Sequence, residues 1–350
     1  MSEKREKSTI VTIAKEIGVS PSTVSRSFDP NSRISTEMRQ RILECAKRQN
    51  YIPNRAASRL PMKSIRIGLL VNDFYEPATT GFHRGVNAAY QELHDLKIQF
   101  ESCVLNYRTK TIDMLERALE RFRGFDGLIV SGFTDLPEIQ ALNRYFRAHH
   151  NLVLIQADVP GIERLSVSKH DSSVAGRLAA EYLGDCLRMA PSRDVVLFTG
   201  DRNWETHSIA AETFPIAAKE NGLNLIATYN MRDSEELLTR QLKMLYEDEG
   251  KRPRGIYITS GKSLALCEYI KSHRLCDTTA LVTSDVSNEI GEYMKEGVVW
   301  ATIYQDFYNQ AYHAFVRLVH HTLGEQEIDK LLLHAPALVL GSKLDYYLKN

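Results

Sequence analysis

The stretch Tyr51-Ile-Pro-Asn-Arg-Ala-Ala-Ser-Arg-Leu60 divides this 350-residue chain into two parts of different character. Pro53 suits the first position of a helix, and the alanines, Arg59 and Leu60 that follow favour helix. About seven residues are too few to hold a helix alone in water. We therefore expect residues 54–60 to become helical only when a partner braces them, which would make the stretch a switch between the two parts.

The two parts differ in charge. Residues 1–63 carry 13 Lys and Arg against 6 Asp and Glu, a net charge of +7, whereas residues 64–350 carry 31 against 38, a net charge of −7. A basic segment joined to an acidic body indicates that the first part alone meets a polyanion such as nucleic acid. The length, with 43% apolar and 25% charged residues, is ordinary for a globular protein of more than one domain.

The cellular compartment is indicated by three features. The five cysteines are odd in number and have no C-x-x-C spacing, which indicates reduced thiols. No apolar run reaches the length that spans a membrane. The first residues, 1–7, lack the apolar core of a secretory signal. We therefore expect a cytoplasmic protein with no membrane partner.

The first part predicts three short helices. Apolar residues in 10–17 recur at the spacing of one helix face, and Gly18 can end that helix. After a tight turn, Ser20 can cap a second helix with Pro21 at its first position. A third helix begins near Ser35. Two helices joined by a three-residue turn, with small polar side chains outside, form the geometry that enters a DNA major groove. A plain three-helix bundle with a solvated polar face remains the alternative.

The same residues resemble a known family. The phrases that carry the resemblance are Thr12–Arg26 (TIAKEIGVSPSTVSR), Arg33-Ile-Ser-Thr36 and 50–60 (NYIPNRAASRL), which look like the head of the lactose-repressor (LacI/GalR) family. The resemblance implies a helix-turn-helix domain at 1–53 with its recognition helix at 21–28. It also implies a hinge helix within 54–63, whose Leu60 is pushed as a wedge between base pairs in the minor groove. The DNA contacts that it implies are Thr12, Ser20, Pro21, Ser22, Thr23, Ser25, Arg26, Arg33, Tyr51, Asn54, Arg55, Ala57 and Leu60.

The chain departs from that family at two prolines. Pro21 stands where many relatives have a hydrogen-bonding side chain, so base reading is expected to rest more on Ser22 and Arg26. Pro61 directly follows Leu60, and the residue before a proline is biased away from helix. Pro61 therefore either ends the hinge helix cleanly or weakens the wedge.

From residue 64 on, short apolar runs alternate with amphipathic helices, which predicts parallel sheets with helices on both faces. The runs are 65–71, 127–130, 152–155, 195–198, 255–258 and 280–283, and the helices include 82–93, 113–122, 175–187, 209–221, 235–247 and 264–273. Two groups of strands fit two doubly wound subdomains better than one very wide sheet. We expect a sensor domain at 64–350, with subdomain one at about 64–170 and 302–330 and subdomain two at about 171–300 and 331–350.

This second part resembles the type I periplasmic sugar-binding proteins. The matching phrases are Phe125-Asp-Gly-Leu-Ile-Val130, Asp158-Val-Pro-Gly161, 175–181 (AGRLAAE), Thr283-Ser-Asp285 and Thr302-Ile-Tyr-Gln-Asp306. The resemblance implies an α/β body of two subdomains that close on a small polar ligand, a sugar or a sugar derivative. In such sheets the ligand lies at the carboxyl ends of the strands.

The ligand candidates follow from these strand ends. Asp285 and Gln305 match two positions that hold sugar hydroxyls in these proteins. Their chemistry suits that role, because a carboxylate accepts hydroxyl protons and an amide both donates and accepts. Trp204 can stack on the face of a sugar. His207 and Ser208 are further candidates, although many relatives have an arginine where this chain has Ser208. The remaining candidates are Asp73, Tyr75, Glu76, Gln156, Asp158, Asp171 and Ser260. Each of these residues can instead serve only as a helix cap or a loop anchor.

No catalytic chemistry, cofactor or metal site is expected. The chain has no G-x-S-x-G or H-E-x-x-H motif, and Ser260-Gly-Lys-Ser263 lacks the first glycine of a phosphate loop because Ile256 stands there. The resemblance implies a homodimeric transcriptional regulator that binds a pseudo-palindromic DNA operator and responds to a sugar-like effector. Two alternatives are a sugar-processing enzyme with a fused helix-turn-helix head and a binding protein for transport.

Overall fold

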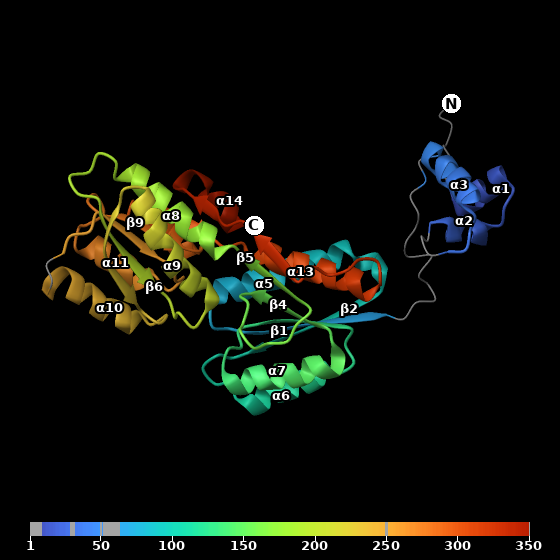
Figure 1. Ribbon diagram of the computed structural model, residues 1–350, viewed down its shortest axis with the longest axis horizontal. Helices are drawn as coiled ribbons and strands as arrows, with labels where there is room; N and C mark the ends of the chain where they lie inside the picture. Colours follow the sequence, from blue (N-terminus) through green and yellow to red (C-terminus); the bar gives the residue numbers. More distant parts are fainter. Residues whose placement is uncertain (1–8, 29–31, 50, 52–63, 249–250, 350) are drawn as a thin grey trace. The chain divides into compact units, whose positions relative to one another are not determined.

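The computed structural model describes residues 9–28, 32–49, 51, 64–248 and 251–349 of the chain. Their Cα positions separate a helical head from an α/β body, and each is described by itself (Figure 1). The hinge helix expected within 54–63 lies outside the described residues. Among the described helices, none combines the length and the apolar character needed to cross a membrane.

Three helices build the head, α1 (Ile10–Ile17), α2 (Pro21–Ser27) and α3 (Thr36–Arg48). Each begins at a hydroxyl side chain, Thr9, Ser20 or Ser35, that accepts a hydrogen bond from the backbone of the first turn. Gly18 ends α1 in the left-handed conformation, with φ at 77°. The side chains enclosed between the helices are Ile13, Ala14, Val24, Ile42, Cys45 and Ala46. The three predicted helices and the turn between the first two are confirmed.

The described part of the body contains two six-stranded sheets. The first has the order β11-β5-β4-β3-β1-β2, built from β1 (Ile65–Asn72), β2 (Ile98–Leu105), β3 (Gly127–Ser131), β4 (Leu152–Gln156), β5 (Ser166–His170) and β11 (Leu331–His334). The second has the order β12-β10-β9-β8-β6-β7, built from β6 (Asp194–Thr199), β7 (Asn224–Asn230), β8 (Gly255–Ile258), β9 (Ala280–Ser284), β10 (Ala301–Tyr304) and β12 (Ala337–Val339). In the first sheet, parallel pairing joins each strand to the next in the series β1, β3, β4, β5 and β11. In the second sheet, parallel pairing joins β7, β6, β8, β9 and β10 in the same way, and β12 joins β10 antiparallel.

Helices cover both faces of each sheet, and each sheet with its helices forms a lobe (Figure 1). In the first lobe, α6 (Ile112–Arg121) and α7 (Leu136–His149) pack on one face, and α5 (Glu76–Glu92) and α13 (Phe307–Thr322) lie on the other. In the second lobe, α8 (Ser172–Cys186) and α9 (Glu205–Glu220) cover one face. The helices on its other face are α10 (Glu235–Lys243), α11 (Leu264–Ser272), α12 (Asn288–Lys295) and α14 (Leu344–Lys349). The predicted fold class, doubly wound sheets behind a helix-turn-helix head, is confirmed.

The sheets differ from the expected subdomain limits at two strands. Thr302 of β10 pairs with Thr283 in the second sheet, although residues from 302 on were assigned to subdomain one. Leu331 of β11 pairs with Val167 in the first sheet, although residues from 331 on were assigned to subdomain two. Both pairings join segments far apart in the chain, and the local pattern of apolar residues does not encode the partner of a strand.

The helices α5 and α13 approach each other closely because α5 carries two glycines where they meet. A Cβ atom at Gly81 would lie 2.8 Å from the Cβ atom of Phe307, and one at Gly85 would overlap the carbonyl oxygen of Tyr308. Glycine is therefore required at this contact. The close approach sets the first turns of α5 and α13 side by side, at the edge where β1, β9 and β10 end.

Candidate functional site

The exposed face of α2 in the head carries small polar groups and an arginine. Pro21, Ser22 and Arg26 are exposed, as the sequence predicted. The Ser20 hydroxyl accepts a hydrogen bond from the backbone N–H of Thr23 (3.1 Å) and lies 2.8 Å from the hydroxyl of Ser22. Arg26 Nε donates to the carbonyl oxygen of Ser22 (3.2 Å), which holds the guanidinium along the helix. Hydroxyls and a guanidinium on one helix face are groups that contact base edges and phosphates in a major groove.

Two of the DNA-contact candidates have structural roles inside the head. The Thr12 hydroxyl donates to the carbonyl oxygen of Thr9 (2.8 Å) and accepts from its N–H (2.9 Å), which closes the capping box of α1. The Tyr51 ring packs on Phe28, with 5.9 Å between the ring centroids. Of the others, Ser20 and Arg33 are exposed and Thr23 and Ser25 are half-buried. The hinge candidates Asn54, Arg55, Ala57 and Leu60 lie outside the described residues.

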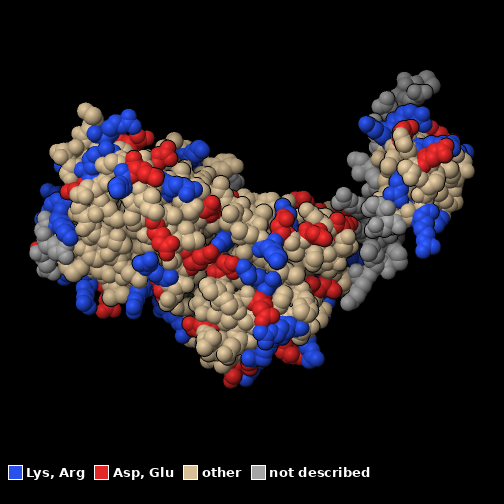
Figure 2. Space-filling view, viewed as in Figure 1, with Lys and Arg blue, Asp and Glu red and all other residues tan. Residues whose placement is uncertain are grey.

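The charges on the body are mixed in sign. On the face that Figure 2 shows, Lys and Arg are interspersed with Asp and Glu over both lobes. No large basic field covers this face of the body. The basic excess of the chain therefore belongs to residues 1–63, which carry the net charge of +7.

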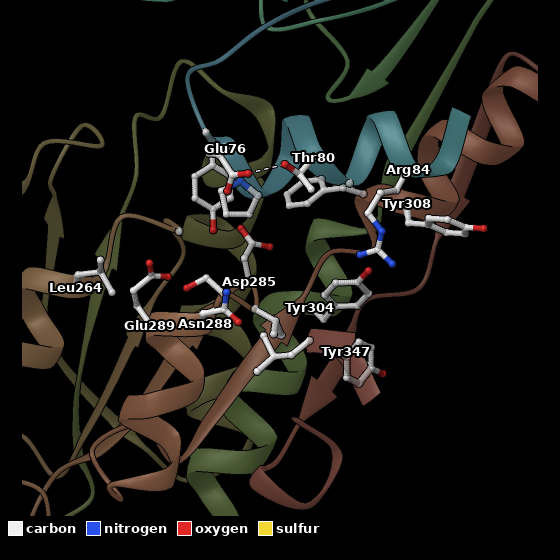
Figure 3. Close-up of a pocket in the computed structure, with 18 residues that line it drawn as sticks. Glu76, Thr80, Arg84, Leu264, Asp285, Asn288, Glu289, Tyr304, Tyr308 and Tyr347 are labelled. Carbon is white, nitrogen blue, oxygen red and sulfur yellow. Dashed lines mark hydrogen bonds between the residues drawn. The ribbon is translucent and has the colours of Figure 1, made fainter. Parts of the chain in front are cut away.

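A pocket of about 460 Å³ opens in the body where β1, β9 and β10 end (Figure 3). The beginning of α5 supplies Tyr75 and Glu76, and the segment after β9 supplies Asp285. Other lining side chains come from the first turn of α12, the end of β10, the beginning of α13, and α14, and they are Asn288, Glu289, Tyr304, Phe307, Tyr308, Tyr347 and Leu348. Three of the predicted ligand contacts, Tyr75, Glu76 and Asp285, thus share one pocket.

Asp285 lies at this pocket with only 3% of its surface exposed. Its Oδ2 accepts a hydrogen bond from Gln305 Nε2 at 2.9 Å, and its Oδ1 accepts none from the described residues. Burial raises the pKa of Asp285 to about 7, and Gln305 and the Tyr75 hydroxyl oppose that shift. A buried carboxylate oxygen without a partner can accept the proton of a ligand hydroxyl.

Aromatic rings line the side of the pocket formed by β10, α13 and α14. The rings of Tyr304 and Tyr347 have centroids 4.7 Å apart and are tilted by 55°. The ring of Tyr75 meets Phe307 edge to face, at 6.2 Å between centroids. Burial, followed by the charges of Asp306 and Asp285, raises the pKa of Tyr304, so its hydroxyl stays protonated and can donate. Such rings offer flat apolar faces for stacking together with polar tips.

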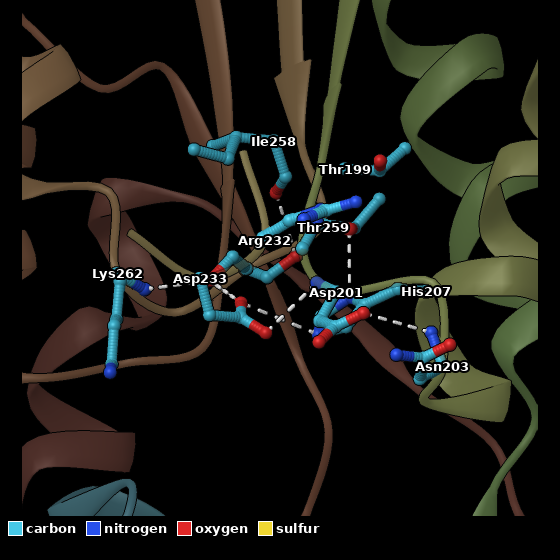
Figure 4. A network of polar contacts seen from close by, with 12 residues as sticks. Thr199, Asp201, Asn203, His207, Arg232, Asp233, Ile258, Thr259 and Lys262 are labelled. Atoms are coloured by element: carbon cyan, nitrogen blue, oxygen red, sulfur yellow. Dashed lines mark hydrogen bonds and ion pairs between the residues drawn. The ribbon is translucent and has the colours of Figure 1, made fainter. Parts of the chain in front are cut away.

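A second group of polar side chains lies where β6 and β8 end (Figure 4). His207 Nδ1 is 2.8 Å from Thr259 Oγ1, and His207 Nε2 is 3.6 Å from Asp233 Oδ1. Asp233 also accepts hydrogen bonds from the Ser260 hydroxyl (2.5 Å) and from the backbone N–H of Asp201 (2.9 Å). Burial lowers the pKa of His207, which keeps the ring neutral, although Asp233 opposes the shift. These side chains satisfy one another, so His207 and Ser260 make contacts within their own lobe.

The space beside His207 is small. A cavity of about 10 Å³ is lined by His207, His170 and Gln305 among others. That volume corresponds to about one water molecule and does not hold a sugar. Trp204 borders another cavity of about 10 Å³, together with Ser131 and Phe133.

The remaining candidates anchor loops and helix ends. Asp73 accepts hydrogen bonds from the backbone N–H of Tyr107 (2.6 Å) and from Asn106 Nδ2 (2.9 Å), and Asp171 caps α8 through Ser173 N–H (3.0 Å). Gln156 Oε1 accepts from the Ser131 hydroxyl at 2.7 Å, Asp158 pairs with Arg164, and the Ser208 hydroxyl lies 3.5 Å from Glu212 Oε1. None of these five lines the 460 Å³ pocket.

Side chains of the two lobes contact each other directly. Glu205 of α9 accepts hydrogen bonds from Lys169 Nζ (2.5 Å) and from the backbone N–H of Asp158 (3.1 Å), both in the first lobe. Lys262 Nζ lies 3.9 Å from the centroid of the Phe74 ring. The two lobes are therefore in direct contact at these residues, none of which lines the 460 Å³ pocket.

Sequence reasoning missed several pocket residues. Three of them lie on helices, away from the strand ends, and they are Arg84, Asn288 and Glu289. Three tyrosines were also missed, and they are Tyr304, Tyr308 and Tyr347. One signal was available, because Glu76, Thr80 and Arg84 recur at intervals of four and therefore share a polar face of α5. No local pattern indicates that residues 347 and 304 become neighbours.

The class of this protein is defined by a helix-turn-helix head joined to a two-lobed α/β body. Residues 9–54 match the bacterial regulatory proteins of the lacI family, and residues 67–326 match the periplasmic binding protein domain. The chain therefore carries a lacI-family head at residues 9–54, and over most of its length, residues 67–326, it belongs to the periplasmic binding protein domain family. This agrees with the resemblance inferred from the sequence.

Two curated relatives illustrate the similarity. The chain is 35% identical to the probable HTH-type transcriptional repressor ExuR of Bacillus subtilis over 108 residues, which are 29% of this chain and 32% of that protein. It is 24% identical to catabolite control protein A of Staphylococcus aureus over 236 residues, 65% of this chain and 66% of that protein. The matches to the first four curated relatives span between 21% and 48% of their lengths.

Solved structures share the fold at low sequence identity. The Lac repressor bound to ONPG in its repressed state aligns with a TM-score of 0.62 and 18% identity, covering 95% of this chain and 98% of that one. GanP, a glucose-galactose binding protein from Geobacillus stearothermophilus, aligns with a TM-score of 0.69 and 18% identity, covering 81% of this chain and 99% of that one. At this level of identity, the two alignments establish the fold.

Proposed function

We propose that this protein is a transcriptional regulator whose affinity for operator DNA is set by a small effector bound in its body. The observation that carries the proposal is the joining, in one chain, of a lacI-type head at 9–54 to a periplasmic binding protein domain at 67–326. The curated relatives are named as transcriptional repressors and regulators, which favours a regulator over an enzyme. A cytoplasmic location, where the DNA is, follows from this role.

On DNA, the exposed face of α2 enters a major groove. Ser22 and Arg26 read base edges, and the other basic residues of the head contact phosphates. The protein acts as a homodimer, so two heads read two half-sites and the operator is pseudo-palindromic. The domain limits in this proposal are 1–53 for the head, 54–63 for the hinge and 64–350 for the sensor.

In the body, a polyhydroxylated ligand of the sugar class binds beside Asp285. The unpartnered Oδ1 of Asp285 and the tyrosine rings around the pocket support this class of ligand. Binding changes the angle between the lobes, because the pocket is lined by both of them, and the hinge segment transmits the change to the heads. A coupling free energy of about 1–3 kcal/mol changes the operator affinity roughly 5- to 150-fold.

The experiment that tests the proposal is a gel-shift selection with fragments of the genome that encodes the protein. The regulator is expected to retain a few fragments in the presence of excess competitor DNA, and a sugar from a screened panel is expected to change their retention. Turnover of a sugar without sequence preference on DNA would favour the enzyme instead. Binding of a sugar with no affinity for DNA would favour a transport protein.

A further inference from the structure

Arg84 is the only lysine or arginine among the described residues that line the 460 Å³ pocket. It is exposed, and it forms no ion pair with another described residue. Its guanidinium carbon lies 6.0 Å from the centroid of the Tyr308 ring, and Figure 3 shows the guanidinium directed over Tyr304 into the pocket. The Arg84 guanidinium is therefore the cation that a ligand in this pocket would meet.

Two of the three carboxyl groups that line the same pocket lie at the beginnings of helices. Glu76 lies in the first turn of α5 and accepts a hydrogen bond from the Thr80 hydroxyl (2.5 Å). Glu289 lies in the first turn of α12, where its own backbone N–H and the Ser287 hydroxyl lower its pKa. The positive end of each helix offsets these charges. The charges of Glu76 and Glu289 are therefore partly offset by the helices that carry them.

The acidic and basic groups occupy different ends of the pocket. In Figure 3, Asn288 and Glu289 lie on one side of Asp285, Glu76 lies above it, and Arg84 lies on the other side with Tyr304 and Tyr347. A ligand that spans the pocket meets acceptors for hydroxyl protons at one end and a guanidinium at the other. Arginine binds carboxylate and phosphate groups through two parallel hydrogen bonds.

We propose that the effector is an anionic sugar, a sugar acid or a sugar phosphate, and that Arg84 holds its anionic group and selects for it. The proposal rests on the proposed function, because it names the ligand class of the same pocket.

The test uses the full-length protein and matched forms of glucose, galactose and mannose: the neutral sugar, the uronate, the 6-phosphate and the 2-amino sugar. Thermal unfolding screens all forms, because a ligand that binds the folded state raises the melting temperature. Calorimetry then gives Kd for the wild type, Arg84→Gln and Arg84→Lys. The control is Arg117→Gln, which removes an exposed arginine of α6 outside the pocket.

We expect a uronate or a 6-phosphate to bind more tightly than its neutral parent. The two anionic forms distinguish a sugar acid from a sugar phosphate. Arg84→Gln is expected to reduce the affinity for the anion roughly 10- to 100-fold, the value of a charged hydrogen-bonding pair. Arg84→Lys keeps part of the preference for the anion, and Arg117→Gln keeps all of it.

Three results would overturn the inference: the neutral or amino form binds as tightly as the anion, Arg84→Gln leaves the preference unchanged, or none of the forms binds. Each is distinguishable from failure of the proposed function, because binding of the wild type to its operator is measured separately. A protein that binds its operator and responds only to a neutral sugar would refute the anionic effector and leave the regulator standing.

Discussion

Asp285 combines deep burial with a titratable carboxyl. Its pKa is raised from 3.8 to about 7 by burial, so the folded protein holds the proton more tightly than the unfolded chain does. The contribution of the protonated group to stability is therefore fully present below pH 3.8 and is lost as the pH rises through about 7. The site consequently weakens the fold at the pH where its carboxylate can accept a ligand hydroxyl.

Asp285→Asn removes this pH dependence. We expect the free energy of unfolding of the wild type to fall relative to the variant between pH 5 and pH 8, by on the order of 1–4 kcal/mol. Urea unfolding at both pH values measures the difference, with Asp113→Asn, an exposed change on α6, as the control. Parallel pH profiles for the wild type and Asp285→Asn would rule out the assigned burial.

Arg26→Ala tests how the head reads DNA. Because Arg26 is exposed on α2 beside Ser22, we expect the variant to bind the operator about 1–3 kcal/mol more weakly and to discriminate less between operator and scrambled duplex. Fluorescence anisotropy on both duplexes gives the two affinities. Arg41→Ala, on the exposed side of α3, is the comparison. An equal loss on both duplexes for Arg26→Ala would mean that Arg26 contacts only phosphate.

Individual site residues could be predicted from the sequence where they follow directly on a predicted strand. Asp285 and Gln305 were placed at strand ends by sequence, and the structure brings them within 2.9 Å of each other. Asp73 and Asp171 were placed equally well, yet they anchor a loop and a helix, because strand-end position does not determine which partner a carboxylate finds. Arg84 and Tyr347 were missed because the pocket is assembled from distant segments.

Helix ends are local, and the sequence predicted them well. Thr9 and Ser20 begin helices and Gly18 ends one, because caps depend on a few neighbouring residues. The contact between α5 and α13 is not local. Gly85 has no role within its own helix, and only the packed structure shows that it admits the backbone of Tyr308.

Gly85→Ala tests this helix contact. An alanine in the middle of an exposed helix is normally stabilising by up to about 1 kcal/mol. Here we expect a loss of about 1–3 kcal/mol, because the added methyl group overlaps the carbonyl oxygen of Tyr308. Urea unfolding measures it, and Gly341→Ala is the matched control, since nothing lies within 4 Å of a Cβ at Gly341. Equal stability of the two variants would contradict the close packing of α5 on α13.

The two lobes of the body are joined by contacts across the cleft as well as by the chain. Lys169 and Glu205 retain 11% and 27% side-chain exposure, so their interaction is only partly screened by solvent. The alternation of strands and helices predicted two lobes, because that pattern is present along the chain. It did not predict the contacts between the lobes or the set of residues that line the open pocket, which depend on how the lobes close.

Glu205→Gln should loosen the arrangement of the lobes. The variant removes the charge that Lys169 meets across the cleft, so we expect a larger radius of gyration for the full-length, ligand-free protein in small-angle scattering. Glu163→Gln is the control, because it removes an ion pair to Arg147 within the first lobe. The same radius for Glu205→Gln and wild type would mean that this contact does not hold the lobes together.

The central claim is that the chain is a sequence-specific DNA-binding protein, and one titration tests it most directly. The full-length protein is titrated against the fragment retained in the gel-shift selection and against the same fragment with scrambled half-sites, at several salt concentrations. We predict an affinity ratio of at least about 10³, with both affinities falling as salt rises. Equal affinity for the two duplexes at every salt concentration would contradict the account.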